Sequence, residues 1–326
     1  MFFLLFLTIL NLLLFINLNH LLKLLPVYDF PDNKRKIHSS SIPKIGGIIL
    51  LFNVIPSFFF LEYIQFEQNI FLLLFILILS FFISLLDDLK DVKPTYRLLS
   101  FYIIFFIWIY LDSTMQIKSL NFLMLGIKVD LGIYTYFITP LFILIFLNAL
   151  NLYDGVNGQT VSYIMLFFLF FFLNDIVSYI YVLLVPFLAF FLYFNLKNKI
   201  FLGDTGVTLL AILISFVVIN DYNVNKNLYC EEIFLIMMLP GIDMLRVYLV
   251  RLVRRKDPFK SDNNHLHHIL MKKIPKKFVF IYQAILISTM LILYYTFSVN
   301  LYYIFFIVLV FYTFSLLYLN AEKSKT

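Results

Sequence analysis

The feature that most restricts how this chain can fold is its series of long apolar runs. Residues 71–86, for example, read FLLLFILILSFFISLL and carry no charge. A membrane-spanning helix needs about 20 predominantly apolar residues, so such runs predict transmembrane helices. The composition agrees with this interpretation. Of 326 residues, 62% are hydrophobic and 13% are charged, with a mean hydropathy of +0.94, whereas about 25% are charged in a soluble domain.

Eleven apolar segments are suitable as membrane spans, or ten if nearly continuous neighbours are joined. They predict an all-α polytopic integral membrane protein in which residues 1–326 form one transmembrane domain. The first segment has no basic flank and no small-residue cleavage site, which argues against a removed signal peptide. The segments are residues 2–25, 45–63, 69–86, 97–111, 133–150, 160–174, 177–194, 206–220, 229–250, 277–296 and 299–320.

The distribution of basic residues predicts the orientation. With the N-terminus outside, all 25 Lys and Arg residues except Lys118, Lys128 and Lys226 fall on the inner side. Because cytoplasmic loops are enriched in Lys and Arg, we expect an N-out, C-in topology. The inner loops are then residues 26–44, 87–96, 151–159, 195–205 and 251–276, with the C-terminal tail.

An acidic cluster begins where the run 71–86 ends. Asp87, Asp88 and Asp91 occur within five residues, ahead of Pro94. If the helix continues past Leu86, these side chains share one turn and repel one another unless a cation offsets them. A solvated helix end is the alternative interpretation. Clusters of carboxylates suit Mg²⁺, which prefers oxygen ligands.

The segment NALNLYDGVNGQ, residues 148–159, carries two amides on an apolar span. Asn148 and Asn151 are three residues apart and point the same way. Amides inside a membrane helix are costly unless paired, so they indicate either contacts between helices or a site. Asp154 and Asn157, each followed by glycine, predict turns at the water boundary.

Two further inner loops carry glycines beside polar residues. In FLGDTG, residues 201–206, Asp204 lies at the start of an apolar helix. There it either accepts backbone N–H groups as an N-cap or binds a metal beside a helix start that favours anions. The segment NKRKIHSSSIPKIGG, residues 33–47, contains Arg35, Lys36 and His38. Its basic residues either belong to the general excess of positive charge in cytoplasmic loops, followed by a turn, or bind phosphate.

The last inner loop contains three histidines. His265, His267 and His268 follow a basic helix end in which Asp243 and Arg246 are placed to pair three residues apart. A zinc site is conceivable, but no acid or cysteine completes the usual ligand spacing. Donation of hydrogen bonds to a pyrophosphate suits the histidines better. Together the five loops predict a cytoplasmic-face site for a phosphate-bearing substrate and a divalent cation.

The order of these motifs resembles the polyprenyl-phosphate N-acetylhexosamine-1-phosphate transferases, particularly the WecA/TagO-like branch. The resemblance runs from RKIHSSSIPKIGG through DDLKD, NALNLYDGVNG and FLGDTG to PFKSDNNHLHH, over about 230 residues. It implies ten or eleven helices in the bacterial inner (plasma) membrane. It also implies transfer of a sugar-1-phosphate from a UDP-amino-sugar to a polyprenyl phosphate lipid with release of UMP. The partners are then these two substrates and the membrane, without nucleic acid, and a homodimer is compatible with the family.

The resemblance also implies roles for residues of this chain. Asp87, Asp88 and Asp91 match acids that serve the lipid phosphate and the metal site, and Asp204 with Asn151 match ligands of Mg²⁺, for which Mn²⁺ is the alternative. The remaining matches concern the nucleotide and the phosphates: Asp154, Asn157 and Phe201 for the uridine, His265, His267 and His268 for the pyrophosphate, and more weakly Arg35, Lys36 and His38 for phosphate.

The chain departs from the family at Asn157, where many bacterial members carry aspartate. An amide both donates and accepts hydrogen bonds, so uracil recognition survives while acid chemistry at that position does not. Gln159 is often leucine in bacterial members. The HLHH pattern argues against a MurNAc-pentapeptide donor and favours UDP-GlcNAc, with a UDP-linked deoxy-amino-sugar (FucNAc or QuiNAc type) as the alternative.

Two other function classes compete with a transferase. A transporter of phosphorylated solutes places charges near the bilayer midplane and often shows inverted repeats, whereas here the charges lie at the inner edge. A membrane pyrophosphatase or lipid phosphatase also uses acids and Mg²⁺, and would release phosphate rather than UMP. The sequence leaves the glycan pathway open among O-antigen, common antigen, teichoic acid linkage and capsule.

Overall fold

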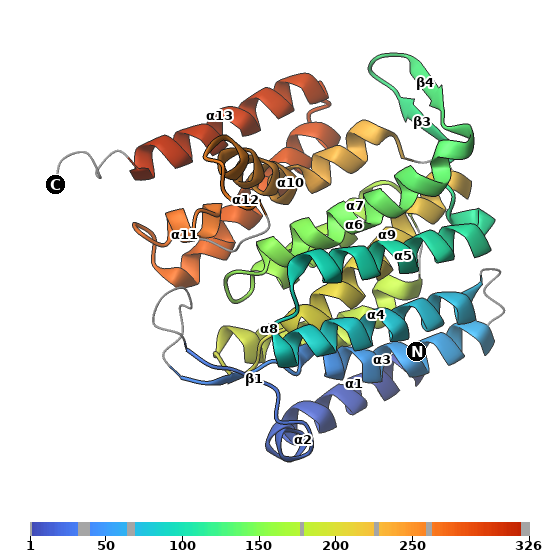
Figure 1. Ribbon diagram of the computed structural model, residues 1–326, viewed down its shortest axis with the longest axis vertical. Coiled ribbons are helices and arrows are strands. Elements are labelled where there is room, and N and C mark those ends of the chain that lie inside the picture. Colours follow the sequence, from blue (N-terminus) through green and yellow to red (C-terminus); the bar gives the residue numbers. More distant parts are fainter. Residues whose placement is uncertain are drawn as a thin grey trace. The chain divides into compact units, whose positions relative to one another are not determined.

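The computed structural model describes residues 2–31, 40–63, 69–176, 179–224, 228–258 and 263–320, and these are predominantly helical (Figure 1). The helices are α1 (Phe2–Ile16), α2 (Leu18–Leu24), α3 (Gly46–Tyr63), α4 (Ile70–Lys90), α5 (Pro94–Leu111), α6 (Thr135–Tyr153), α7 (Gln159–Leu173), α8 (Tyr179–Leu196), α9 (Gly203–Val224), α10 (Cys230–Val253), α11 (Leu266–Leu270), α12 (Lys276–Tyr295) and α13 (Leu301–Asn320). Two short antiparallel strand pairs are also present: β1 (Tyr28–Asp29) with β2 (Ile42–Pro43), and β3 (Ser119–Phe122) with β4 (Ile127–Asp130). Two 3₁₀ helices, η1 (Ser113–Met115) and η2 (Gly132–Tyr134), lie on either side of the second pair.

The chain is an all-α polytopic membrane protein. Within the described residues, eight helices are long and apolar enough to cross a membrane, or nine if α1 and α2, which meet at 71°, form one span. The two shorter apolar helices are α7 and residues Leu301–Leu317 of α13. A helix therefore covers each of the eleven segments expected from the sequence. How many of them cross the membrane, and in which direction, stays a prediction.

The helices fall into two compact units. The first comprises Met1–Lys118, Leu131–Asn151 and Val177–Asn225, and the second comprises Ser119–Asp130, Leu152–Ile176 and Lys226–Thr326.

Helix α9 is the centre of the first unit. Almost all of its residues between Thr205 and Ile219 are buried, as expected for a helix that is apolar on every side. Helices α3 and α4 pack against it, α5 packs against α4, and α8 contacts both α1 and α3 (Figure 1). Buried amides join α1 to α3, because Asn11 and Asn53 exchange hydrogen bonds of 2.6 and 3.1 Å. Such pairs hold membrane helices together.

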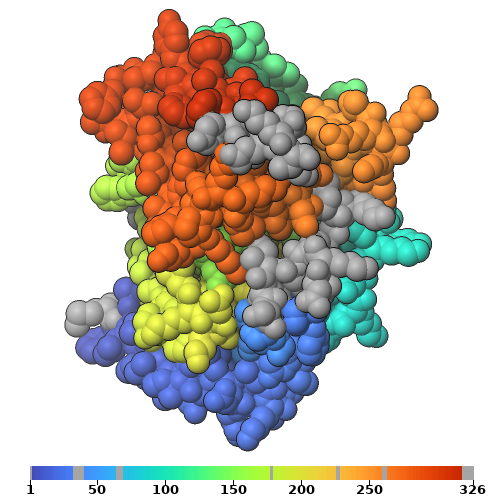
Figure 2. All heavy atoms as spheres, turned by 90° about the vertical axis from the view of Figure 1, so that its left-hand side faces the viewer, coloured from blue at the N-terminus to red at the C-terminus, as the bar shows by residue number. Residues whose placement is uncertain are grey.

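The second unit is built around α10 and α12. Helix α12 contacts α7, α10, α11 and α13, and β3 packs against α10. In Figure 2 the surface of the short helix α11 (orange) lies beside that of α13 (red), which it contacts.

Candidate functional site

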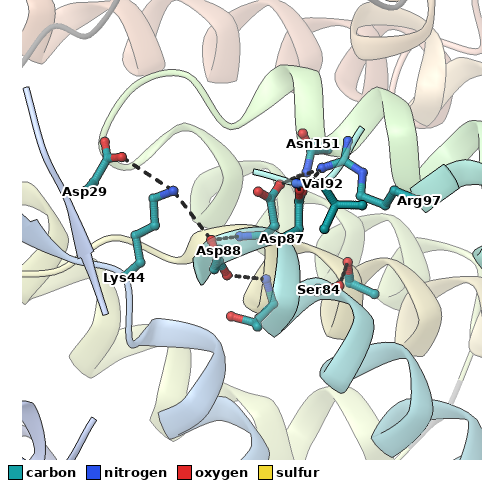
Figure 3. Close-up of polar contacts among 11 residues, drawn as sticks. Asp29, Lys44, Ser84, Asp87, Asp88, Val92, Arg97 and Asn151 are labelled. Carbon is teal, nitrogen blue, oxygen red and sulfur yellow. Dashed lines mark hydrogen bonds and ion pairs between the residues drawn. The ribbon is translucent and has the colours of Figure 1, made fainter. Parts of the chain in front are cut away.

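The predicted acidic cluster forms at the end of α4. This helix extends past Leu86, where the expected span ended, to Lys90, and the side chains of Asp87 and Asp88 are buried (Figure 3). Asp91 differs: it ends the helix in a left-handed conformation (φ 48°), and it is exposed. Among the described residues, no hydrogen bond or ion pair joins its side chain to the other two acids.

Asp88 caps the N-terminus of α9. Its Oδ1 accepts a hydrogen bond from the backbone N–H of Asp204 (3.1 Å), and its Oδ2 accepts one from that of Thr205 (3.0 Å). Gly203 permits this approach, since it has φ 75° and a Cβ there would lie 2.9 Å from Asp88 Oδ2. The interpretation of Asp204 as an ordinary N-cap is therefore wrong, because the capping carboxylate comes from α4.

Asp204 instead faces Asn151 and Arg97. Asn151, on α6, donates a hydrogen bond from Nδ2 to Asp204 Oδ1, and Arg97 Nη1 lies 3.5 Å from the same oxygen. Arg97, near the start of α5, also forms an ion pair with Asp87 (Figure 3). The backbone N–H of Val92 donates a further hydrogen bond to Asp87 (2.8 Å). One guanidinium thus links the two carboxylates, a contact the sequence analysis missed.

Lys44 supplies a second positive charge on the opposite side of Asp88. Its Nζ lies 3.6 Å from Asp88 Oδ1 and 3.4 Å from Asp29 Oδ1 (Figure 3). Burial alone would lower the pKa of Lys44, but the carboxylates of Asp88, Asp29 and Asp204 outweigh burial and raise it above the ordinary value. Lys44 is therefore a cation at neutral pH.

The glycine pair at the start of α3 lets the backbone of this helix approach the backbone of residues 201–206 closely. The N–H groups of Gly46 and Gly47 donate to the carbonyls of Phe201 (3.0 Å) and Leu202 (2.9 Å). A Cβ on Gly47 would lie 2.3 Å from the backbone nitrogen of Gly206. The glycines thus admit the 201–206 segment against the start of α3, where the backbone N–H of Phe201 also donates to the carbonyl of Pro43 (2.8 Å).

The cluster suits a hard divalent cation by its donor chemistry and its charge. Four carboxylates, those of Asp29, Asp87, Asp88 and Asp204, face two cationic side chains, so negative charge is in excess. Oxygen donors of this kind are those that Mg²⁺ prefers. Within the described part of the chain, no three His, Cys, Asp or Glu side chains are already arranged to hold a metal. The carboxylate oxygens that would bind the cation contact the side chains of Arg97 and Asn151 instead.

A second cluster, in the other unit, forms around Asp243. Its Oδ2 lies 2.9 Å from His265 Nδ1, and its Oδ1 accepts from the backbone N–H of Leu266 (3.0 Å). The expected pair with Arg246 is confirmed at 2.8 Å, and Tyr312 of α13 donates from its hydroxyl at 2.7 Å. Asp243 thus anchors the start of the histidine segment, a role that the sequence analysis did not assign.

His267 joins the histidine segment to the loop after α6. Its ring packs on Gly155 so closely that a Cβ there would lie 2.1 Å from His267 Nε2. Burial, followed by the nearby His268 and His265, lowers the pKa of His267 to about 3, so its ring is neutral at physiological pH. In the same loop Asp154 accepts a hydrogen bond from Thr160. Asn157 precedes Gly158, the left-handed N-cap residue (φ 81°) of α7.

The sequence-predicted residues therefore form two groups. Asp87, Asp88, Asn151 and Asp204 meet in the first unit, while Phe201 lies in the same unit and contacts Gly46 and Pro43 through its backbone. In the second, the loop of Asp154 and Asn157 meets the histidines through Gly155, with His265 and His267 buried and His268 half-buried. Arg35, Lys36 and His38 lie outside the described residues.

Residues 70–221, from the start of α4 into α9, match the family model of glycosyl transferase family 4. The match covers 152 of the 326 residues, and over this segment the chain is similar to the family. Its similar relatives include undecaprenyl-phosphate alpha-N-acetylglucosaminyl 1-phosphate transferases. That of Escherichia coli (strain K12) is 24% identical over 253 residues, covering 74% of this chain and 68% of the relative. That of Thermotoga maritima is 28% identical over 254 residues (76% and 74%), and that of Pasteurella multocida 28% over 253 residues (74% and 70%).

The family match contains the whole first cluster apart from Lys44 and Asp29. It also contains the loop of Asp154 and Asn157, whereas the histidines and Asp243 lie beyond residue 221. The residues that carried the sequence resemblance between residues 87 and 204 thus lie in the segment that matches the family model.

Proposed function

We propose that this chain transfers an N-acetylhexosamine-1-phosphate from a UDP-sugar to undecaprenyl or another polyprenyl phosphate and releases UMP. The observation that carries this proposal is the acidic cluster at the end of a membrane helix, inside the segment that matches glycosyl transferase family 4. The names of the relatives support undecaprenyl phosphate as acceptor and GlcNAc-1-phosphate as the transferred group. UDP-GlcNAc is the donor we favour, with a UDP-linked deoxy-amino-sugar as the alternative.

The proposal places both clusters at the cytoplasmic face of a bacterial plasma membrane, in an N-out, C-in topology. The excess of Lys and Arg in the corresponding loops supports this orientation. A site at the end of α4 suits the two substrates, because one is anchored in the bilayer and the other arrives from the cytosol. The product would begin a cell-envelope glycan.

Mg²⁺ is the proposed cofactor, with Asp204, Asn151, Asp87 and Asp88 as the residues that would hold it. When bound, the ion would neutralise charge on the pyrophosphate of the donor. Arg97 and Lys44 hold the acids in place and reduce their mutual repulsion. His265, His267 and His268 would contact the pyrophosphate, and Asn157 with Phe201 and Asp154 would receive the uridine.

The proposed reaction is a direct displacement. An oxygen of the lipid phosphate forms a bond to the β-phosphorus of the donor, the bond from that phosphorus to the bridging oxygen breaks, and UMP leaves with the electron pair. A phosphate monoester has a second pKa of about 6 and is largely ionised at neutral pH. Asp87 and Asp88 therefore need not remove a proton, and their task is to position charge.

The test uses donor labelled with ³²P at the β-phosphate, purified protein and undecaprenyl phosphate in detergent. We expect label in the organic phase only with both substrates and Mg²⁺ present. Asp204→Asn should abolish the transfer, while Asp130→Asn, on the exposed β3–β4 hairpin, should preserve it. Labelled protein formed from the donor alone would contradict direct displacement. Transfer at the wild-type rate by Asp204→Asn would refute the assigned metal site.

A further inference from the structure

The β3–β4 hairpin has one apolar face and one polar face. In its register Leu120 pairs with Val129 and Phe122 with Ile127, which puts these four apolar side chains on one face. The alternate pairs, Ser119 with Asp130 and Asn121 with Lys128, form the polar face. This alternation is that of a strand pair lying between an apolar and an aqueous phase.

The part of this face that lies on β4 and at the turn is exposed, whereas Leu120 and Phe122 on β3 are half-buried. Ile127 and Val129 are 49% and 44% exposed, and Leu123 and Leu125 at the turn are 52% and 57% exposed. An isolated two-stranded hairpin is at best marginally stable in water. Clustered apolar side chains outside the spanning helices therefore indicate a surface that contacts something apolar.

The position of the hairpin identifies that apolar phase. Glu231, in the first turn of α10, accepts hydrogen bonds from the backbone N–H groups of Leu123 (3.2 Å) and Met124 (3.0 Å). Helix α10 is a candidate span, so its first turn lies at a membrane boundary. Glu231 thus holds the turn of the hairpin at the level where the bilayer begins.

We propose that the apolar face of the β3–β4 hairpin inserts into the interfacial layer of the lipid bilayer, while its polar face meets water. The partner is the lipid surface itself. Ile127, Val129 and Leu125 are the inserted residues, and the ion pair of Lys128 with Asp130 (3.3 Å) stays on the aqueous side. The hairpin, which follows α5 and precedes α6 along the chain, would act as an interfacial anchor, independently of the reaction proposed above.

The test uses tryptophan as a depth probe in the full chain. Trp108 is the single tryptophan and is buried, so Trp108→Phe provides a silent background. Ile127→Trp and the neighbouring Lys128→Trp are compared in phosphatidylcholine vesicles with and without bromine on the acyl chains. We expect the fractional loss of emission at position 127 to be at least about twice that at position 128, as for residues on opposite faces of an interfacial element. Iodide in the buffer should quench in the reverse order.

Equal quenching at the two positions would overturn the proposal. So would a probe at position 127 shielded from both bromine and iodide, since a second copy of the chain would then cover the hairpin. If the background fails to fold, the same comparison uses nitroxide labels on Ile127→Cys and Lys128→Cys in a Cys230→Ser chain, where Cys230 is the single cysteine. Collision with oxygen should then prevail at 127 and collision with an aqueous nickel chelate at 128, and the same preference at both would refute insertion.

Discussion

Replacing Asp88 by asparagine should destabilise the first unit, whereas the same change at Asp204 should not. Asp88 accepts two N–H groups at the start of α9 and lies beside Lys44. Hydrogen bonds to charged groups contribute about 1.5–3 kcal/mol each. Asparagine has one acceptor oxygen and turns an NH₂ group towards the other backbone N–H, so one bond is lost and its donor stays buried. We expect the free energy of unfolding to fall by about 2–3 kcal/mol.

Asp204→Asn is the matched control for this effect. The new side chain keeps an oxygen that can accept from Asn151 Nδ2. The loss of its charge weakens the contact with Arg97 but also reduces repulsion with Asp87 and Asp88, so the two effects offset each other. Its free energy of unfolding should change by less than about 1 kcal/mol, although transfer is lost in both variants. Both should still insert into the membrane.

The assay is titration of the purified protein with sodium dodecyl sulfate in mixed micelles, followed by the emission of Trp108. This residue is buried in the first unit and stacks on Phe216 of α9, so it reports directly on the helix that Asp88 caps. Equal stability of Asp88→Asn and the wild type would refute the capping role. A loss of the same size in Asp204→Asn would show that removal of any charge from the cluster is responsible.

Three further outcomes follow from the geometry. Gly203→Ala should lower the free energy of unfolding by at least about 1–2 kcal/mol, because φ is 75° and the new Cβ meets Asp88. Gly241→Ala, where a Cβ meets nothing within 4 Å in a helix, should be neutral or stabilising by up to about 1 kcal/mol. Circular dichroism during the titration reports on the helices of both units, and the reverse order of the two variants would contradict this. Asp243→Asn should lower the free energy of unfolding by about 3 kcal/mol, because it removes one partner of a buried ion pair. An unchanged unfolding midpoint would exclude the anchoring role of Asp243. His267 has a pKa of about 3 in the folded chain and about 6.5 in the unfolded chain, so between these pH values the unfolded chain binds more protons. The free energy of unfolding should therefore fall on acidification by up to about 1.4 kcal/mol per pH unit. If the pH dependence of stability is the same in His267→Gln as in the wild type, this prediction is refuted.

The sequence predicted the positions of the helices well, for a physical reason. A backbone in lipid must satisfy its hydrogen bonds internally, so an apolar run such as residues 71–86 has helix as its available structure. Contacts between residues close in the sequence could be predicted as well. Asp243 and Arg246 are three residues apart on one helix, and their ion pair forms as expected.

Contacts between distant segments could not be predicted in this way. Asp88 and the N–H group of Asp204 that it caps are 116 residues apart, and Arg97 reaches Asp204 over a similar separation. Helix propensity suggests a capping residue at the helix start itself, so it pointed to Asp204. The supporting cations Arg97 and Lys44 resembled ordinary positive-inside charge until the packing of α4, α5 and β2 placed them beside the acids.

The most direct test of the proposed function is the release of UMP by the purified chain from a panel of UDP-sugars, with undecaprenyl phosphate and Mg²⁺. The account predicts UMP from UDP-GlcNAc or a related UDP-amino-sugar. Release should depend on the lipid phosphate, stop when EDTA removes the metal, and be absent in Asp204→Asn. Failure of folded wild-type protein to release UMP from any UDP-sugar in the panel, or release of inorganic phosphate in its place, would contradict it.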